Sequence, residues 1–262
     1  MKSSITKGYD LIGNIAIVKF VRRAKTSNKK GEALKLLKAH KSVRTVLEKK
    51  DRFKGRLRMQ KTKWILGEKT KESLYKENGC QFRLNVDTCY FSPRLANDRF
   101  EIAKSVKKNE NVLIMFGGVA PYAIVIAKVS KPRKIVSVEL SIECDKYASE
   151  NVKRNKFEKK IDLIQGDVKK ALPKLKRKFD RIVMTRPNLK DSFFNIAFSK
   201  IKKGGYIHYY GFYQESELKK LKELVNYESM KAGKDIKILK IKKAGDIGIR
   251  KFRYRVDFRV LN

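Results

Sequence analysis

The 262-residue sequence predicts an α/β fold with a mostly parallel sheet, preceded by a small α+β domain. Two observations predict it. Strand-like and helix-like segments alternate from about residue 95 onward, whereas the first third consists of shorter β-branched segments around one helical pattern. We expect the small domain to cover residues 1–87 and the larger domain to cover 88–262.

The small domain is predicted from short apolar segments that turn signals separate. Residues 9–21 are rich in β-branched side chains, and Gly13-Asn14 interrupts them, which predicts two strands joined by a turn. Apolar residues at near-helical spacing predict a helix over 31–49. Further strands are expected at 56–59, 64–67 and 81–86. Because basic residues occur throughout this part, we expect it to bind RNA.

The larger domain begins with a helix expected at 95–107, and five β/α steps follow. The expected strands are 112–116, 134–140, 161–164, 179–184 and 205–212, and the expected helices are 123–129, 143–155, 190–202 and 214–226. Two further strand-like stretches, 236–243 and 252–261, form an antiparallel pair. The resulting seven-stranded sheet is the layout of a class I (Rossmann-like) methyltransferase.

The charge of the chain indicates a polyanionic partner. It has 65 Lys and Arg against 27 Asp and Glu, a formal charge of +38. Nucleic acid is the favoured partner, and an anionic membrane surface is the second candidate. Compositional bias or heat adaptation also enriches lysine, but heat adaptation adds glutamate too, and the acids lag here.

Cysteine, histidine and hydropathy patterns point to a protein of the reducing cytoplasm. Cys80, Cys89 and Cys144 form no CxxC pair, and His40 and His208 are the only histidines, so we expect neither a metal site nor a disulfide framework. No segment approaches the roughly 20 apolar residues of a membrane helix, and no signal peptide is recognisable. We therefore expect no membrane contact.

Glycines follow the first strand of the larger domain, in Met115-Phe116-Gly117-Gly118-Val119-Ala120-Pro121. A residue without Cβ lets backbone N–H groups approach a ligand closely. The stretch lacks the third glycine of a dinucleotide fingerprint, and Pro121 removes a donor, so a pyrophosphate cofactor is disfavoured. S-Adenosylmethionine has no phosphate and meets neither objection.

Acids follow the next two strands. Glu139-Leu140 ends the second strand, where a carboxylate accepts ribose hydroxyls, and Gly166-Asp167-Val168 follows the third, where an acid receives the adenine amino group. Either acid alone is more often an ordinary solvated loop residue. Together with the glycines, they indicate an adenosylmethionine crevice.

The fourth strand ends in Met184-Thr185-Arg186-Pro187-Asn188, at the edge that faces the methyl acceptor in class I enzymes. The Asn/Asp-Pro-Pro-aromatic pattern of amino-methylating enzymes is absent, so methylation of an exocyclic amine is disfavoured. Pro187 is equally consistent with a plain helix start.

The stretch Thr88-Cys89-Tyr90-Phe91-Ser92-Pro93-Arg94-Leu95-Ala96-Asn97-Asp98-Arg99 carries a specific resemblance. Together with MFGGVAPYAIVIAK (115–128), GGYIHYY (204–210) and RVDFRV (255–260), it resembles the archaeal and eukaryotic tRNA (guanine-N1)-methyltransferases, which modify the guanosine at position 37, immediately 3′ of the anticodon. Upstream, YDLIGNIAIVKF, HKSVRTVLEK and GRLRMQKTKWILGE resemble the middle domain of that family, so the resemblance covers nearly the whole chain.

The resemblance implies the roles of the site residues. Asp98 would be the base that removes the N1 proton of guanine, and Arg58 would stabilise charge on O6. Pro187 would line the guanine pocket. Cofactor contacts would come from Tyr90, Arg99, Met115, Phe116, Gly117, Gly118, Val119, Pro121, Glu139, Leu140, Gly166, Asp167, Val168 and Thr185. From the sequence alone, Arg58 is also consistent with a phosphate contact, and Asp98 with a first-turn helix residue.

Three departures from the family are visible. The small N-terminal domain of the family is not recognisable, Ile114 replaces an acid, and Asp98 and Thr185 replace the usual Glu and Asn or Pro. We expect a monomer that acts on tRNA with S-adenosylmethionine as methyl donor, S-adenosylhomocysteine as product and no metal. Two alternatives stay open: methylation of a wyosine-type intermediate at the same position, and a non-catalytic RNA-binding protein with this fold.

Overall fold

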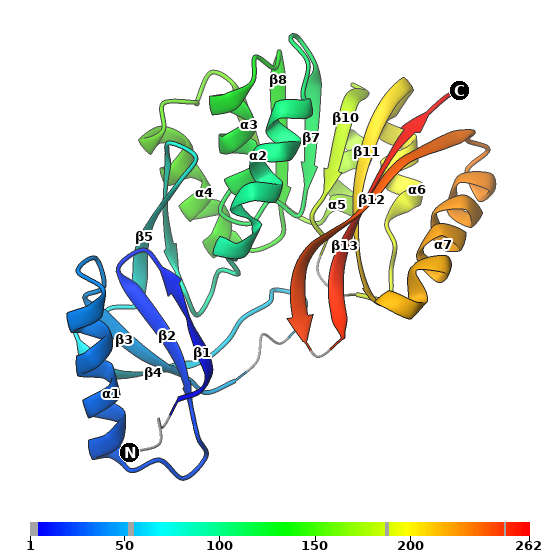
Figure 1. Ribbon diagram of the computed structural model, residues 1–262. Coiled ribbons are helices and arrows are strands. Elements are labelled where there is room, and N and C mark those ends of the chain that lie inside the picture. Colours follow the sequence, from blue (N-terminus) through cyan, green and yellow to red (C-terminus); the bar gives the residue numbers. More distant parts are fainter. Residues whose placement is uncertain (1–4, 52–54, 187–188, 249) are drawn as a thin grey trace. The chain divides into compact units, whose positions relative to one another are not determined.

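The computed structural model describes residues 5–51, 55–186, 189–248 and 250–262. The chain divides into two compact units, Met1–Pro93 and Arg94–Asn262. Figure 1 draws the first unit in blue and cyan and the second in green to red. Within the described ranges, no helix is long and apolar enough to cross a membrane.

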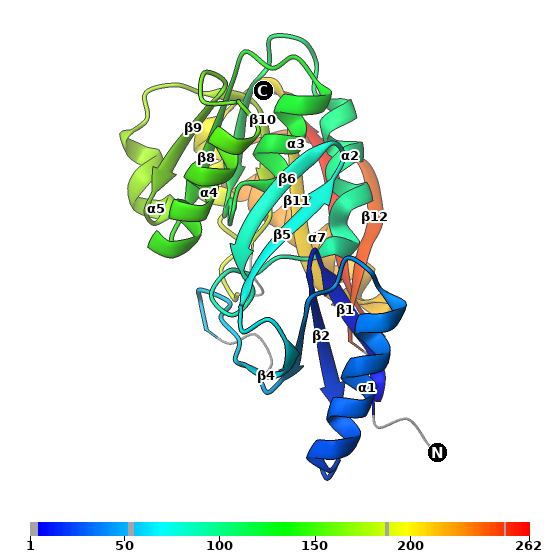
Figure 2. The ribbon, with the colours of Figure 1, turned by 90° about the vertical axis from the view of Figure 1, so that its left-hand side faces the viewer.

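The first unit combines a four-stranded sheet of order β1-β2-β3-β4 with one helix and a separate hairpin, β5-β6 (Figure 2). Its elements are β1 Ile5–Ile12, β2 Ile15–Phe20, α1 Thr26–Ala39, β3 Thr45–Lys49, β4 Thr62–Gly67, β5 Glu72–Glu77 and β6 Cys80–Asn85. The predicted pair of strands around Gly13-Asn14 is confirmed, because β1 and β2 pair antiparallel there.

The predicted helix over 31–49 is wrong in its second half. Helix α1 ends at Ala39, and Thr45–Lys49 is strand β3, which pairs parallel with β2 and antiparallel with β4. Thr45, Val46 and Leu47 are all fully buried, as expected for a central strand. A short continuous apolar run fits either a buried helix or a central strand, so periodicity alone could not separate the two.

The strand predicted over 56–59 is also wrong. Residues 55–58 form a turn, and Met59 makes only an isolated bridge. Gly55 and Arg58 have φ values of +68° and +56°, in the left-handed region that reverses the chain rather than extending it.

Strand β5 was not predicted, although the sequence holds a signal for it. Asn78 and Gly79 join β5 to β6 with φ values of +48° and +70°. Asn-Gly is the preferred pair for a two-residue hairpin loop with positive φ at both positions.

The second unit contains a seven-stranded sheet of order β12-β13-β11-β10-β7-β8-β9. Its elements are η1 Pro93–Leu95 at the junction, α2 Ala96–Ser105, β7 Asn111–Met115, α3 Pro121–Val129, β8 Lys134–Glu139, α4 Ile142–Arg154, β9 Ile161–Gln165, α5 Val168–Ala171, η2 Leu172–Lys174, β10 Phe179–Met184, α6 Phe194–Lys200, β11 Ile201–Gln214, η3 Glu215–Glu217, α7 Leu218–Lys231, β12 Ile236–Gly248 and β13 Lys251–Val260. Strands β7 to β11 pair parallel with one another, and β13 runs antiparallel to β11 and β12. The predicted α/β fold with a mostly parallel sheet is confirmed.

Both faces of this sheet are covered by helices (Figure 1). Helix α2 packs beside α3, whereas α6 packs beside α7. Successive side chains of β11 point to opposite faces of the sheet and so contact helices on both sides. Tyr209 stacks on Phe194 of α6, and Tyr210 bonds to Asp98 of α2.

Candidate active site

Four parallel strands bring their carboxyl ends to one edge of the sheet, where ligands bind in open α/β folds. The register aligns Met115 of β7 with Val138 of β8 and with Met184 of β10. Glu139 of β8 aligns with Gln165 of β9. The predicted cofactor residues that follow these strands therefore lie along one edge.

The loop after β7 has an unusual backbone. Phe116, Gly118 and Ala120 adopt positive φ values of +65°, +56° and +64°. A Cβ at Gly117 would lie 2.1 Å from the hydroxyl oxygen of Ser137, so a larger residue here would have to displace that hydroxyl. Helix α3 then begins with Pro121, whose ring occupies a position where an N–H has no helical partner.

Glu139 links this loop to the next helix. Its carboxylate accepts the Gly118 N–H and the Ser141 N–H, both at 2.7 Å. Burial raises the pKa of Glu139, and the backbone donors oppose that rise. Each carboxylate oxygen keeps one further acceptor position.

The turn after β9 continues the same edge. The Gly166 N–H donates to the Glu139 carbonyl at 2.7 Å, with φ +148° at Gly166. Asp167 accepts the Lys169 N–H at 2.9 Å and caps α5, and Val168 is buried behind it. The Leu140 carbonyl accepts from the Gln165 side chain at 2.9 Å.

Thr185 joins β10 to the glycine loop. Its hydroxyl lies 2.8 Å from the Phe116 carbonyl oxygen and 3.1 Å from that of Met115. Pro187 and Asn188, which follow Arg186, lie outside the described residues, so the predicted role of Pro187 stays a prediction.

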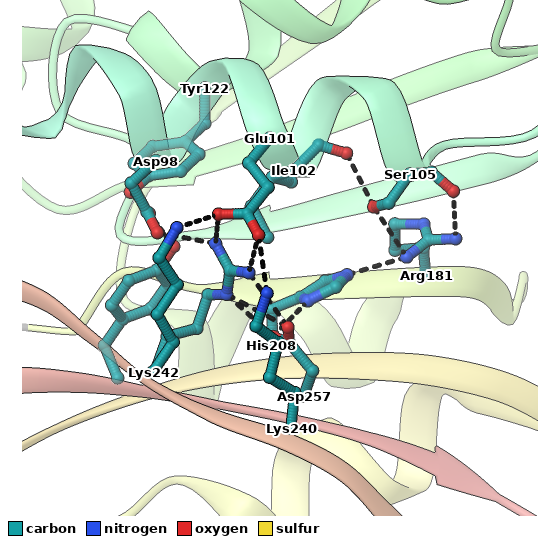
Figure 3. Close-up of polar contacts among 12 residues, drawn as sticks. Asp98, Glu101, Ile102, Ser105, Tyr122, Arg181, His208, Lys240, Lys242 and Asp257 are labelled. Carbon is teal, nitrogen blue, oxygen red and sulfur yellow. Dashed lines mark hydrogen bonds and ion pairs between the residues drawn. The ribbon is translucent and has the colours of Figure 1, made fainter.

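Asp98 lies in the first turn of α2 and is 4% exposed. Figure 3 shows its carboxylate among polar partners. Tyr122 donates to Oδ2 at 2.8 Å, Tyr210 donates to the same oxygen, and Arg255 donates to Oδ1 at 2.5 Å. A carboxylate offers about four acceptor positions, so roughly one, on Oδ1, is left.

Arg255 extends this arrangement into a charged cluster, defined as Asp98, Glu101, Arg181, His208, Lys240, Lys242, Arg255 and Asp257 (Figure 3). Its guanidinium also pairs with Asp257 at 2.8 Å and with Glu101 at 3.3 Å. Lys242 and Lys240 donate to Glu101, and together with Arg255 they lower the pKa of Glu101 to about 2 against the opposing effect of burial.

His208 is held as a neutral ring inside the charged cluster. Its Nε2 lies 2.7 Å from Nη1 of Arg181, and its Nδ1 lies 2.7 Å from Oδ1 of Asp257. Since a guanidinium only donates, Nε2 must be the acceptor and Nδ1 must carry the proton. Burial lowers the pKa of His208, and the neighbouring Asp257 opposes that effect.

The remaining predicted residues occupy two places. In the first unit, the Arg58 guanidinium lies 4.7 Å from the centroid of the Tyr90 ring. In the second unit, Arg99 is 2% exposed and its guanidinium lies 5.8 Å from the centroid of the Tyr122 ring.

Sequence reasoning missed the three partners of Asp98. Tyr122, Tyr210 and Arg255 lie 24, 112 and 157 residues away from it along the chain. All three fall within stretches that carried the resemblance, but no pattern in a single sequence pairs a side chain with an acid so far away.

The edge fits a phosphate-free adenosyl cofactor. In the described part of the chain, Asp145 Oδ1 is buried without a hydrogen-bond partner, and the charge of Asp145 acts on Glu139. Burial raises the pKa of Asp145 as well. Hydroxyl and amino groups of a ligand would supply the donors that these two carboxyls lack. The sheet order, the glycine loop and the acid after β8 define a class I methyltransferase.

Comparison with known proteins is specific about the kind of methyltransferase. The sequence profile of the TRM5/TYW2 methyltransferase domain matches residues 73–239. The tRNA (guanine(37)-N(1))-methyltransferase Trm5b of Pyrococcus abyssi is 33% identical over 99% of this chain and 77% of its own length. The crystal structure of that Trm5b superposes on this chain with a TM-score of 0.87. The superposition covers 100% of this chain and 81% of the Trm5b chain. The chain therefore belongs to the TRM5/TYW2 methyltransferase family.

Two further relatives bear on the substrate. The tRNA (guanine(37)-N(1))/4-demethylwyosine(37)-methyltransferase Taw22 of Nanoarchaeum equitans is 35% identical over 95% of this chain and 98% of its own length. The complex structure of aTrm5 and tRNALeu matches with a TM-score of 0.84 and 27% identity, covering 98% of this chain and 73% of that chain.

Proposed function

We propose that this protein transfers the methyl group of S-adenosylmethionine to N1 of guanosine 37 in tRNA. The observation that carries the proposal is the similarity to Trm5b over 99% of the chain, which includes every strand end of the candidate site. The solved relative in complex with tRNALeu supports tRNA as the partner.

Glu139 is the proposed acceptor for the ribose hydroxyls, because two backbone N–H groups already fix its carboxylate. Asp167 would receive the adenine amino group, with Leu140 and Val168 beside the ring. The loop from Met115 to Pro121 and Thr185, together with Tyr90 and Arg99, would surround the rest. When bound, S-adenosylmethionine supplies a methyl group activated by its sulfonium.

Asp98 is the proposed base. Guanine N1 is protonated at neutral pH, so it becomes a nucleophile only when that proton is removed. Three donors fix the Asp98 carboxylate and leave one acceptor position on Oδ1 for the N1 proton. The proposed part of Arg58 is to stabilise the charge that builds on O6, because a guanidinium donates parallel hydrogen bonds.

The high positive charge is the proposed basis of tRNA affinity. A net charge of +38 attracts phosphates of any sequence, so affinity should fall steeply as salt increases. We assign RNA contacts to the small domain, proposed to cover 1–87, and cofactor binding to the larger domain, proposed to cover 88–262. The protein is proposed to act as a monomer.

The test uses two tRNA transcripts that differ only in guanosine or adenosine at position 37. Incubated with radiolabelled S-adenosylmethionine, the guanosine transcript alone should gain label, recovered as N1-methylguanosine after digestion. Equal labelling of both transcripts would place the target elsewhere. Binding of tRNA with no labelling would favour a non-catalytic RNA-binding protein.

A second candidate substrate is 4-demethylwyosine at the same position, and the similarity to Taw22 over 98% of its length favours it. Transfer to tRNA that carries this tricyclic base should then occur at a comparable rate. Mass spectrometry of the digested tRNA would detect the added methyl group, and an unchanged tricyclic base would restrict the enzyme to guanosine.

A further inference from the structure

A polar pocket of about 370 Å³ lies within the second unit, beside the segment that follows β10. That volume is within the range of small-molecule sites. The pocket is lined by Arg186, Leu189, Lys190, Asp191, Ser192, Tyr209, Phe212, Tyr213, Leu224 and Glu228. The side chains come from Arg186, from residues 189–192, from the end of β11 and from α7, so the pocket is separate from the charged cluster under α2.

Arg186 gives the pocket a donor. Its side chain is 6% exposed, and it donates from Nε and Nη2 to the carbonyl oxygens of Leu189 and Asp191. These bonds tie the Arg186 side chain to the backbone of Leu189 and Asp191. Its Nη1 has no hydrogen-bond partner in the described part of the chain, so two N–H groups of a buried guanidinium remain available.

Glu228 gives the pocket an acceptor. Its Oε1 accepts the Ser192 hydroxyl at 2.9 Å, and in the described ranges Oε2 has no hydrogen-bond donor. Burial raises the pKa of Tyr209, Arg186 opposes the rise and Glu228 adds to it.

Aromatic rings give the pocket flat walls. Tyr213 and Phe212 stand at the end of β11. A Cβ at Gly211 would lie 2.5 Å from Cε2 of Tyr213, so the ring rests against the backbone where a side chain is missing. Bases of single-stranded nucleic acid stack on such rings.

We propose that this pocket binds an unpaired RNA base next to the target nucleotide, in addition to the site that receives the target. The inference rests on the proposed function for its RNA. The free donor of Arg186 and the free acceptor of Glu228 match a base edge that carries both a carbonyl and N–H groups, as guanine does. The carboxylate of Glu228 repels a phosphate. Arg186 directly follows Thr185, whose hydroxyl donates to the Phe116 carbonyl in the loop after β7, so the bound base would lie close to the reacting one.

The test couples changes in the protein to changes in the RNA. The variants are Tyr213→Leu on β11 and Glu228→Gln on α7. The controls are Tyr227→Leu and Glu223→Gln, which change exposed side chains of α7. Binding is measured with S-adenosylhomocysteine present, using tRNA transcripts in which one anticodon-loop nucleotide at a time is abasic. We expect Tyr213→Leu to weaken binding about 10-fold and the controls to leave it unchanged.

The diagnostic result is non-additivity at one position. The transcript that lacks the bound base should bind the unaltered protein about 10-fold more weakly than the intact transcript does. The Tyr213→Leu variant should bind these two transcripts with equal affinity. Additive losses at every position would overturn the proposal, and coupling at position 37 itself would overturn it in favour of a target pocket. Methyl transfer is measured separately, so a failure of the proposed activity leaves the binding result readable.

Discussion

The Arg255 guanidinium on β13 donates to the Asp98 carboxylate on α2 at 2.5 Å, and the two side chains are only 2% and 4% exposed. Removing two charges from water is costly unless each is well paired. Both are, because Tyr122 and Tyr210 also donate to Asp98, while Glu101 and Asp257 accept from Arg255. The pair fixes α2, which carries the proposed base, against the antiparallel end of the sheet.

Asp98→Asn should reduce methyl transfer by about 10²- to 10⁴-fold, the usual contribution of a positioned base. An amide is nearly the same size but does not accept the N1 proton. Arg255 keeps two carboxylate partners, so the variant should fold, with a lower free energy of unfolding. Single-turnover rates at saturating tRNA would check this, and a rate within a few-fold of the unaltered protein would remove Asp98 from the role of base.

Tyr210→Phe removes one donor from Asp98 and leaves Tyr122 and Arg255 in place. The loss of one buried hydrogen bond should lower the free energy of unfolding by about 1 kcal/mol. The looser carboxylate should slow methyl transfer by roughly 10-fold while tRNA binding is unchanged. The exposed Tyr227→Phe is the matched control. Lower stability with an unaltered rate would mean that Tyr210 supports the fold only.

His208 should make stability depend on pH. Its pKa is lowered in the folded protein, so at mildly acidic pH the unfolded chain binds a proton that the native ring does not. The free energy of unfolding should therefore fall as pH drops below about 6.5, the ordinary value of histidine. Glu101, with a pKa of about 2, adds its own loss only below about 4.5.

Urea unfolding at pH 7, 6 and 5 tests this pH dependence. His208→Gln should flatten the slope between pH 7 and 5. An equal slope in the unaltered protein and in His208→Gln would assign the pH dependence to other groups.

The sequence was sufficient for the alternating elements of the second unit because its central strands are short apolar runs, and glycine or an acid closes β7, β8 and β9. It failed where the same pattern serves two structures. Thr45–Lys49 reads as a continuation of helix α1, and only the pairing of β3 between β2 and β4 makes it a strand. Arg58 was expected in a strand and lies in a turn.

The candidate site was also predictable only in part. Residues that follow strand ends, such as Gly118, Glu139 and Asp167, were predicted because the topology of parallel strands brings them to one edge. The three partners of Asp98 were not, because they come from α3, β11 and β13 and meet only in the folded chain. Pairing of that kind depends on strand register, which local sequence does not specify.

Gly117→Ala should weaken cofactor binding. The added Cβ would overlap the Ser137 hydroxyl oxygen and push the loop away from β8, which disturbs the Gly118 N–H that Glu139 accepts. We expect a loss of stability of about 1–3 kcal/mol and at least 10-fold weaker binding of S-adenosylhomocysteine, measured by calorimetry. Gly31→Ala is the control, since Gly31 lies on the exposed side of helix α1, a Cβ there meets nothing within 4 Å, and the helix should become more stable by about 1 kcal/mol. Unchanged affinity in a folded Gly117→Ala protein would show that the loop after β7 does not form the cofactor site.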